Sequence, residues 1–316
     1  MTQKNKPIWI GSSYEHDCSF VQCDYTAKNL SKLKELLIKY EDCSKIVTWM
    51  YICNMTGEIF PVQEIGKLCH EYNAIFVCDL TAGLHNEPIP NNIDDWCDIA
   101  IWSGAKVGAE KGTGGIWFSE RAWREHCIGD EPPLHFGTPN AAQAMAQAIA
   151  IKHCQNEISR RLSERYRTWR YIDDKWIRLW QRLTSGIIDI RADYSDITKQ
   201  FRLGNYEFSN GIVGLYLPDI NADAFQQFAS TRQIYFSVFH SACAGQDDYR
   251  VAEAYGLTKE QAAHCIRLSF GYETNEQDID RFIEVLKEFR EMFCSDGVRE
   301  AKKELAGRGV LVGLSE

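Results

Sequence analysis

The chain has 316 residues, of which 45% are hydrophobic and 25% are charged. This length predicts one catalytic unit of two lobes or two domains, and the composition excludes a disordered chain. No apolar run reaches the ~18 residues that a membrane helix needs. Thirty-five lysines and arginines against 44 aspartates and glutamates give a net charge of -9. We therefore expect neither membrane insertion nor direct nucleic-acid binding.

The cysteines and the first residues indicate the compartment. Twelve cysteines are scattered along the chain without a C-x-x-C pair, and several lie inside apolar segments such as VTWMYICN. That pattern is typical of reduced, buried thiols rather than of a disulfide framework or a zinc site. The N-terminal residues lack the apolar stretch of a secretory signal peptide. We therefore expect a cytoplasmic protein.

The first 140 residues alternate short apolar runs with helical periodicity, which predicts an α/β domain with a mostly parallel sheet. In such a sheet, ligands bind at the carboxyl ends of the strands. The predicted strands are Pro7–Gly11, Lys45–Cys53, Ala74–Asp79, Asp98–Trp102 and Gly114–Phe118, and the predicted helices are Leu30–Tyr40 and Pro61–Tyr72.

The second half of the chain reads as a smaller α+β domain. Prolines and a glycine over Glu131–Pro139 interrupt the pattern, so we expect domains at 1–140 and 141–316. A long helix is predicted from Ala141 to Leu183. The later predicted elements are strands at Gly211–Leu217, Ile234–Val238 and Cys265–Phe270, helices at Thr258–His264 and Glu276–Phe293, and a tail at Ala301–Glu316 that begins as a helix.

A carboxylate and a lysine follow neighbouring predicted strands. Asp79 ends the strand AIFVCD, and Lys106 lies in the turn SGAKVGAEKGTGG after the next strand. Such a pair suits pyridoxal phosphate, because the lysine can form a Schiff base while the carboxylate keeps the pyridine nitrogen protonated. Either residue alone is more typical of a turn or a solvated loop. The turn matches neither common phosphate-binding glycine pattern, so a nucleotide site is not favoured.

Several sequence blocks, in order along the chain, resemble the cysteine desulfurases of the class V aminotransferases. They are CNMTGEIFP, the strand ending at Asp79, SGAKVGAEKGTGG, HFGTPN, FHSACAG and IRLSFGYETNEQDID. The resemblance implies a fold type I pyridoxal phosphate-dependent transferase, with a mostly parallel α/β domain and a smaller α+β C-terminal domain. It also implies L-cysteine as the substrate, a sulfur-acceptor protein as partner, and a homodimer.

The resemblance also implies roles around the cofactor. Lys106 would form the Schiff base and Asp79 would pair with the pyridine nitrogen. Asn54 would contact the ring oxygen and the substrate, and Ser103 would contact the phosphate. His16, in the stretch SSYEH, would stack on the ring and take part in catalysis.

Three further roles concern the substrate and the second subunit. Arg267 would bind the substrate carboxylate, because its guanidinium can donate two parallel hydrogen bonds to a carboxylate. It lies on a predicted apolar strand, where an unpaired guanidinium would be costly, so an anionic partner is expected there. Cys243 would be the nucleophile, on an exposed loop of small and polar residues. Thr138 would reach the phosphate in the neighbouring subunit.

The sequence also departs from the family pattern. It begins after the family's N-terminal stretch, whose Gly-Ala-Thr loop binds the phosphate, so we expect an N-terminally truncated cofactor domain. Met55, Ala82, Ala105 and His135 replace the family's glutamate, glutamine, histidine and arginine. Each change removes about 1–3 kcal/mol where a buried polar partner is left unmet.

Three functions follow from these observations. In the first, the Cys243 thiolate attacks the sulfur of substrate cysteine, leaving alanine and a protein persulfide that passes to an acceptor. In the second, the chain is a degenerate family member that acts as a binding or scaffolding subunit. In the third, it is a related lyase that acts on cystine or selenocysteine.

Overall fold

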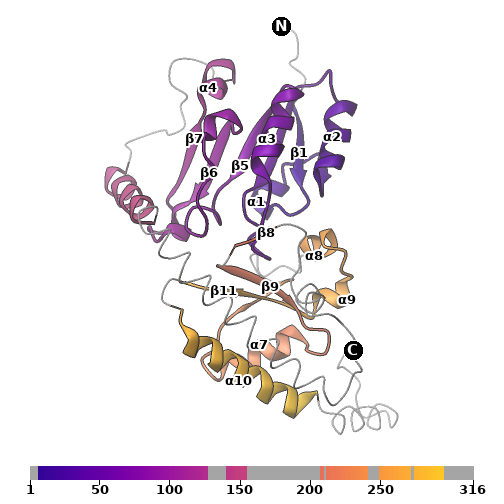
Figure 1. Ribbon diagram of the computed structural model, residues 1–316, viewed down its shortest axis with the longest axis vertical. Helices are drawn as coiled ribbons and strands as arrows, with labels where there is room; N and C mark the ends of the chain where they lie inside the picture. Colours follow the sequence, from indigo (N-terminus) through magenta and orange to yellow (C-terminus); the bar gives the residue numbers. More distant parts are fainter. Residues whose placement is uncertain are drawn as a thin grey trace.

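The computed structural model describes residues 6–126, 140–154, 207–209, 211–240, 249–271 and 274–294. These residues form two lobes, each built on its own sheet (Figure 1). The large lobe holds the N-terminal half of the described chain and the small lobe holds the C-terminal half. Within the described ranges, no helix is both long and apolar enough to cross a membrane.

A six-stranded sheet forms the large lobe, in the order β2-β1-β3-β5-β6-β7. All neighbouring strands are parallel except β6 and β7, which pair antiparallel. The prediction of a mostly parallel α/β layer is therefore confirmed. The strands are β1 (Ile8–Ser12), β2 (Tyr25–Ala27), β3 (Lys45–Met50), β5 (Ala74–Asp79), β6 (Ile99–Ser103) and β7 (Gly114–Phe118).

Amphipathic helices cover this sheet. In α2 (Leu30–Lys39), Leu33, Leu36 and Leu37 are buried, which is the three- and four-residue spacing of one helix face. Its neighbour α3 (Val62–Glu71) packs against β3 and β5. The shorter helices of this lobe are α1 (Asp17–Phe20), η1 (Ile93–Asp95), η2 (Gly104–Val107) and α4 (Glu120–His126).

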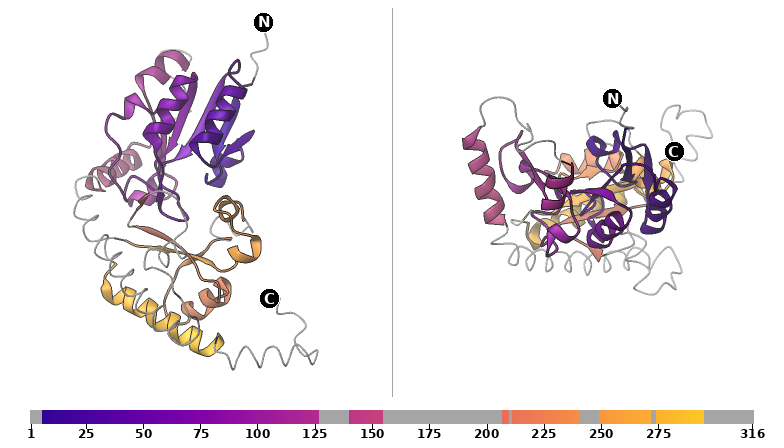
Figure 2. Two further views of the ribbon diagram at one scale, coloured as in Figure 1. Left: turned by 45° about the vertical axis from the view of Figure 1, so that its right-hand side comes forward. Right: turned by 90° about the horizontal axis from the view of Figure 1, so that it is seen from above.

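The small lobe is a three-stranded antiparallel sheet of order β10-β11-β9 backed by helices. Figure 2 shows α7 and α10 on the side of this sheet that faces away from the large lobe. Phe225 of α7 packs on Phe282 and Phe289 of α10, so aromatic contacts hold this core together. The elements are β9 (Ile212–Tyr216), α7 (Ala222–Ser230), β10 (Ser237–Val238), α8 (Arg250–Ala254), α9 (Lys259–Ala262), β11 (Cys265–Ser269) and α10 (Glu276–Phe293).

Contacts outside the large sheet join the lobes. The short strand β4 (Glu58–Ile59) pairs antiparallel with β8 (Glu207–Phe208). Beside them, the Tyr255 hydroxyl donates to Glu58 Oε2 at 2.5 Å and lies 2.9 Å from the Thr56 hydroxyl. Glu58 and Thr56 are both fully buried, so these polar groups are satisfied by one another.

Several predicted elements are shorter in the structure. The predicted strand Ile234–Val238 is only β10, because Ile234 and Phe236 pack on the core of the small lobe before pairing begins. The predicted helix Thr258–His264 is α9, since Thr258 is its N-cap. Nine other elements were not predicted from the sequence, namely α1, β2, β4, η1, η2, α4, β8, α7 and α8. Most are too brief to give a periodic signal, but α7 was missed although its buried residues Ala222, Phe225 and Ala229 recur with helical spacing.

Some predictions lie outside the described residues. Of the predicted helix Ala141–Leu183, residues 141–154 are described and are helical. The break at Glu131–Pro139 and the tail Ala301–Glu316 are outside. The domain boundary at residue 140 stays a prediction.

Candidate active site

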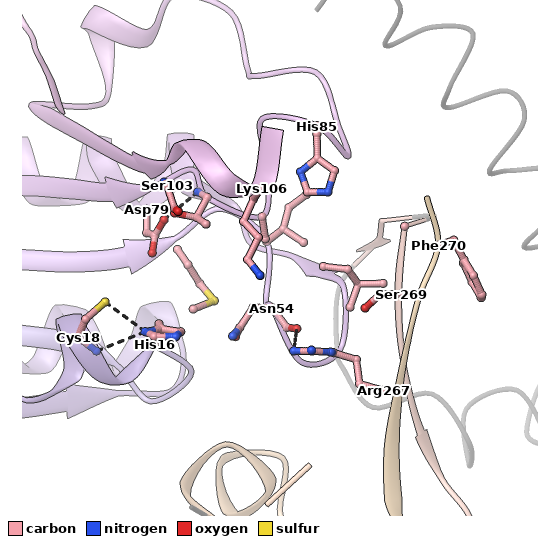
Figure 3. A pocket seen from close by; sticks show the side chains of 16 residues that line it. His16, Cys18, Asn54, Asp79, His85, Ser103, Lys106, Arg267, Ser269 and Phe270 are labelled. Atoms are coloured by element: carbon pink, nitrogen blue, oxygen red, sulfur yellow. Dashed lines mark hydrogen bonds between the residues drawn. The ribbon is translucent and has the colours of Figure 1, made fainter. Parts of the chain in front are cut away.

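A cavity of about 410 Å³ lies where the large sheet ends, with the small lobe as its opposite wall. Most of the predicted site residues line it, namely His16, Asn54, Asp79, Ser103, Lys106 and Arg267 (Figure 3). They come from separate elements that meet only in the folded chain. Cys243 and Thr138 lie outside the described residues.

Asp79 is the last residue of β5 and supplies a buried carboxylate to the cavity wall. Its side chain is 8% exposed, and Oδ1 accepts the Thr81 backbone N–H at 2.7 Å. Burial raises the pKa of Asp79, while the hydrogen bond to Thr81 and the charge of His16 oppose that rise. A cation held in the cavity would stabilise the ionised form.

Lys106 is presented to the cavity by the short helix η2. The Gly104 N–H donates to the Thr113 oxygen at 2.9 Å, and the Ala109 N–H donates back to Gly104 at 3.0 Å. A Cβ at Gly104 would lie 2.1 Å from Thr113 Oγ1, so the turn requires glycine. Figure 3 shows the Lys106 amine pointing into the cavity, toward Asn54.

His16 stands on the wall below Asp79 and is fixed by its own turn. It is the N-cap of α1, and its Nδ1 accepts the Cys18 backbone N–H at 3.3 Å. The Cys18 sulfur lies 3.1 Å from the same nitrogen. With Nδ1 as acceptor, a neutral ring carries its proton on Nε2.

Ser103 is the last residue of β6 and lines the cavity where this strand ends. Its backbone N–H donates to Thr81 Oγ1 at 3.1 Å, which ties the end of β6 to the turn after β5. The Thr81 and Ser103 side chains therefore lie together beside Asp79, as parallel neighbouring strands require.

Arg267 enters the cavity wall from the small lobe. Its Nη1 donates to the Asn54 backbone oxygen at 3.1 Å, and its Nη2 donates to Ser237 Oγ at 2.9 Å. The Met55 sulfur is 3.7 Å from Nη1. These contacts orient the guanidinium.

Among the cavity-wall residues that sequence reasoning missed are Cys18, His85, Ser269 and Phe270. Cys18 and His85 could have been found from their positions, two residues after His16 and six after Asp79. Ser269 and Phe270 come from the end of β11, two and three residues beyond Arg267. Figure 3 shows His85 beside Lys106 on the turn that follows β5.

The residues of this cavity fit pyridoxal phosphate. A buried carboxylate, a lysine amine and a histidine ring face one space, and a guanidinium on the far wall can take a carboxylate. Among the described residues, no group of three or more potential metal ligands is found.

Solved structures share this fold. A NifS-like protein from Rickettsia africae ESF-5 matches with a TM-score of 0.68 at 22% identity, over 90% of this chain and 76% of that one. A serine palmitoyltransferase from S. paucimobilis, solved with a bound PLP–myriocin aldimine, matches with a TM-score of 0.63 at 14% identity, over 90% and 67%. The chain has the fold of the fold type I pyridoxal phosphate enzymes.

The sequence places the chain within a family. The family model described as Aminotransferase class-V matches residues 18–282. The chain belongs to the class V aminotransferase family, as the sequence blocks predicted.

Curated relatives in this family are cysteine desulfurases. The cysteine desulfurase IscS of Mannheimia succiniciproducens is 27% identical over 246 residues, which cover 75% of this chain and 55% of that protein. A cysteine desulfurase of Nostoc sp. is 29% identical over 310 residues, covering 92% and 73%. A probable mitochondrial cysteine desulfurase of Dictyostelium discoideum is 25% identical, covering 77% and 51%. The chain thus spans little more than half the length of some relatives that it matches.

Proposed function

We propose that the chain acts as a pyridoxal phosphate-dependent cysteine desulfurase, which takes sulfur from L-cysteine and releases alanine. The observation that carries this proposal is the meeting of Lys106, Asp79 and Arg267 in one cavity, each from a different element. The cysteine desulfurases among the relatives support the same reaction.

Asp79 and Lys106 would hold the cofactor. Pyridoxal phosphate supplies an electron sink when it is bound. The buried Asp79 carboxylate has little water to stabilise its negative charge. An ion pair with the protonated pyridine nitrogen would stabilise that charge, so Asp79 can keep the nitrogen protonated. The Lys106 amine can attach to the cofactor aldehyde and afterwards carry a proton to or from the substrate. Ser103, at the end of β6, can donate to the phosphate.

Arg267 would bind the substrate carboxylate. Its contacts with Asn54 and Ser237 fix the plane of the guanidinium, so the fork meets a carboxylate without a further ordering cost. The Asn54 side chain lines the same space and can orient the bound amino acid or the cofactor's ring oxygen.

Cys243 would attack the substrate sulfur. A sulfur–sulfur bond forms while the carbon–sulfur bond breaks, and the carbon keeps the electron pair and takes up a proton to give alanine. His16 lies on the wall below Asp79 and can supply that proton from Nε2. The protein persulfide would pass its sulfur to an acceptor protein by thiol exchange.

The assembly and the compartment belong to the same proposal. We place the protein in the cytoplasm as a homodimer in which Thr138 contacts the phosphate of the neighbouring subunit. A C₂ pair would give both sites that contact. Light scattering should give the mass of two chains, and the mass of one chain at working concentration would contradict the dimer.

Borohydride trapping tests the proposed function. The chain is incubated with pyridoxal phosphate, L-cysteine and a thiol reductant that cleaves the persulfide to sulfide, and sulfide and visible absorbance are measured. A second sample with the cofactor alone is reduced with borohydride and mapped by peptide mass spectrometry. We expect sulfide release and an adduct on Lys106. Lys106→Ala should lose both, whereas Lys111→Ala, an exposed lysine of the same turn outside the cavity wall, should keep both.

Other outcomes would favour the alternatives. A chain that never takes up the cofactor would be a binding or scaffolding subunit. A chain that binds the cofactor and acts on cystine or selenocysteine but not on cysteine would be a lyase.

A further inference from the structure

Glu15 is a buried acid that the proposed chemistry does not use. It precedes His16 and is 0% exposed. Its Oε1 accepts the Ser12 hydroxyl at 2.9 Å and the Met50 backbone N–H at 2.6 Å. Its Oε2 is buried with no hydrogen-bond partner among the described residues. A buried carboxylate oxygen without a donor is costly when charged and is better satisfied as a protonated acid.

Glu15 binds the end of β3, the strand that pairs with β5 and with Asp79 at its end. Met50, which donates to Glu15, pairs with Asp79 in the register of β3 and β5. Burial raises the pKa of Glu15 to about 8, and the charge of Asp79 adds to that rise. The two carboxyls therefore compete, because ionising one makes it harder to ionise the other.

Other titratable groups also act on this pair: Glu15 interacts electrostatically with Arg250, Cys23 and Cys78, and the charge of His16 lowers the pKa of Asp79. Arg250 lowers the pKa of Glu15, but it also donates to Asp17 Oδ1 at 2.8 Å and to the Ser13 oxygen at 3.2 Å. The Cys23 and Cys78 thiols feel the charge of Glu15, and burial raises the pKa of each, for Cys23 to about 11. Both thiols are neutral near neutral pH.

We propose that Glu15 carries a proton while Asp79 is ionised, and that Glu15 gives this proton to solvent when Asp79 holds a cation. Glu15 is a positioning residue, since it acts on the cofactor only through Asp79. The coupling of the two carboxyls does not depend on the cofactor. The nature of the cation, a protonated pyridine ring, rests on the proposed function.

The interaction between Glu15 and Asp79 links cofactor affinity to the protonation state of Glu15. If a cation at Asp79 favours the ionised form of Glu15, then ionising Glu15 must favour the bound cation by the same factor. Part of the pH dependence of cofactor affinity should therefore come from Glu15.

The first test uses the chain without cofactor. Infrared spectroscopy follows the protonated carboxyl band from about pH 6 to about pH 10 in the parent, Glu15→Gln, Asp79→Asn and Glu58→Gln proteins. Glu58 is the matched control, because it is also fully buried but accepts a hydrogen bond from Tyr255 rather than from Met50, the residue that pairs with Asp79. We expect one carboxyl to titrate near pH 8 in the parent and in Glu58→Gln, and to be absent in Glu15→Gln.

Asp79→Asn is the decisive variant in that series. Removing the neighbouring charge should lower the Glu15 midpoint, although burial, the larger cause of the raised pKa, remains. An unchanged midpoint, or the absence of any band that Glu15→Gln removes, would overturn the proposal.

The second test measures proton release on binding. Calorimetric titration of pyridoxal phosphate near pH 7.5 (roughly half a unit below the Glu15 midpoint) in two buffers of different ionisation enthalpy counts the protons. The parent should release more protons than Glu15→Gln, and equal counts would overturn the release step. If the cofactor does not bind at all, both the proposed function and the release of the Glu15 proton on binding are wrong. The infrared experiment still tests whether the charge of Asp79 raises the pKa of Glu15.

Discussion

Arg267 on β11 donates to the backbone oxygen of Asn54 at 3.1 Å, although the two residues are 213 positions apart in the chain. The contact joins the small lobe to the turn after β3, where the large sheet ends. It places a cation opposite Asp79 and Lys106, across the cavity (Figure 3). The position of the candidate substrate site therefore depends on how the lobes meet.

Changing Arg267 should weaken substrate binding. Arg267→Lys keeps the charge but loses the planar fork, and Arg267→Ala loses both. A charged hydrogen bond contributes about 1.5–3 kcal/mol, so we expect the KM for L-cysteine to rise about 10–100-fold. Steady-state kinetics measures this change. Arg281→Lys, on the exposed face of α10 with Glu284 as its partner, is the control and should leave KM unchanged. An unchanged KM in Arg267→Ala would remove this residue from the substrate site.

Cys243→Ser should abolish sulfide release while the cofactor still binds. The thiol is needed to take the sulfur, whereas Lys106 and Asp79 hold the cofactor without it. Sulfide assays and visible absorbance on the same sample separate the two effects. Cys43→Ser, an exposed thiol outside the cavity, should behave as the parent. Sulfide release by Cys243→Ser at the parent rate would favour the lyase.

Gly57 should tolerate no side chain. Its φ is +77°, and a Cβ there would lie 2.0 Å from the Ile212 backbone oxygen at the start of β9. Strain and overpacking together predict a loss of about 2–5 kcal/mol in the free energy of unfolding of Gly57→Ala. Denaturant unfolding measures that loss.

Gly112 provides the matched control for Gly57. Its φ is +88°, but a Cβ there would meet nothing within 4 Å. Gly112→Ala should therefore lose only the conformational cost of about 1–2 kcal/mol. Equal losses in the two variants would show that the close approach of Gly57 to β9 does not matter for stability.

Glu15 should make the apoprotein less stable as the pH rises. Its pKa is about 8 in the folded chain against an ordinary value of 4.5, so the folded state binds its proton more tightly. The free energy of unfolding therefore falls from about pH 4.5 to about pH 8 through this group. Glu15→Gln should match the parent at low pH and exceed it above neutrality, as measured by melting temperature against pH. If the melting temperatures of the parent and Glu15→Gln proteins changed with pH in parallel, the raised pKa of Glu15 would be wrong. Glu58→Gln is the control for the loss of a buried acid.

Much of the large lobe could be predicted from the sequence. The apolar runs ending at Asp79 and just before Lys106 identified neighbouring strands, and parallel strands bring their carboxyl ends to one edge. The strand-end pair needed no knowledge of the rest of the molecule. The brief elements of the small lobe were harder, since β10 has only two residues and its flanking apolar residues pack instead of pairing.

The sequence by itself determined which residues end the strands of the large sheet and which chemistry they suit, because strand periodicity and strand ends are local properties of the chain. Only the tertiary structure decided that Arg267 faces those strand ends, that His85 and Cys18 reach the same cavity, and that Glu15 is shielded from water beside Asp79. A glutamate next to a histidine and an aspartate reads as a solvated turn in a sequence. Its burial, and with it the state of its proton, depends on contacts with strands that lie far along the chain.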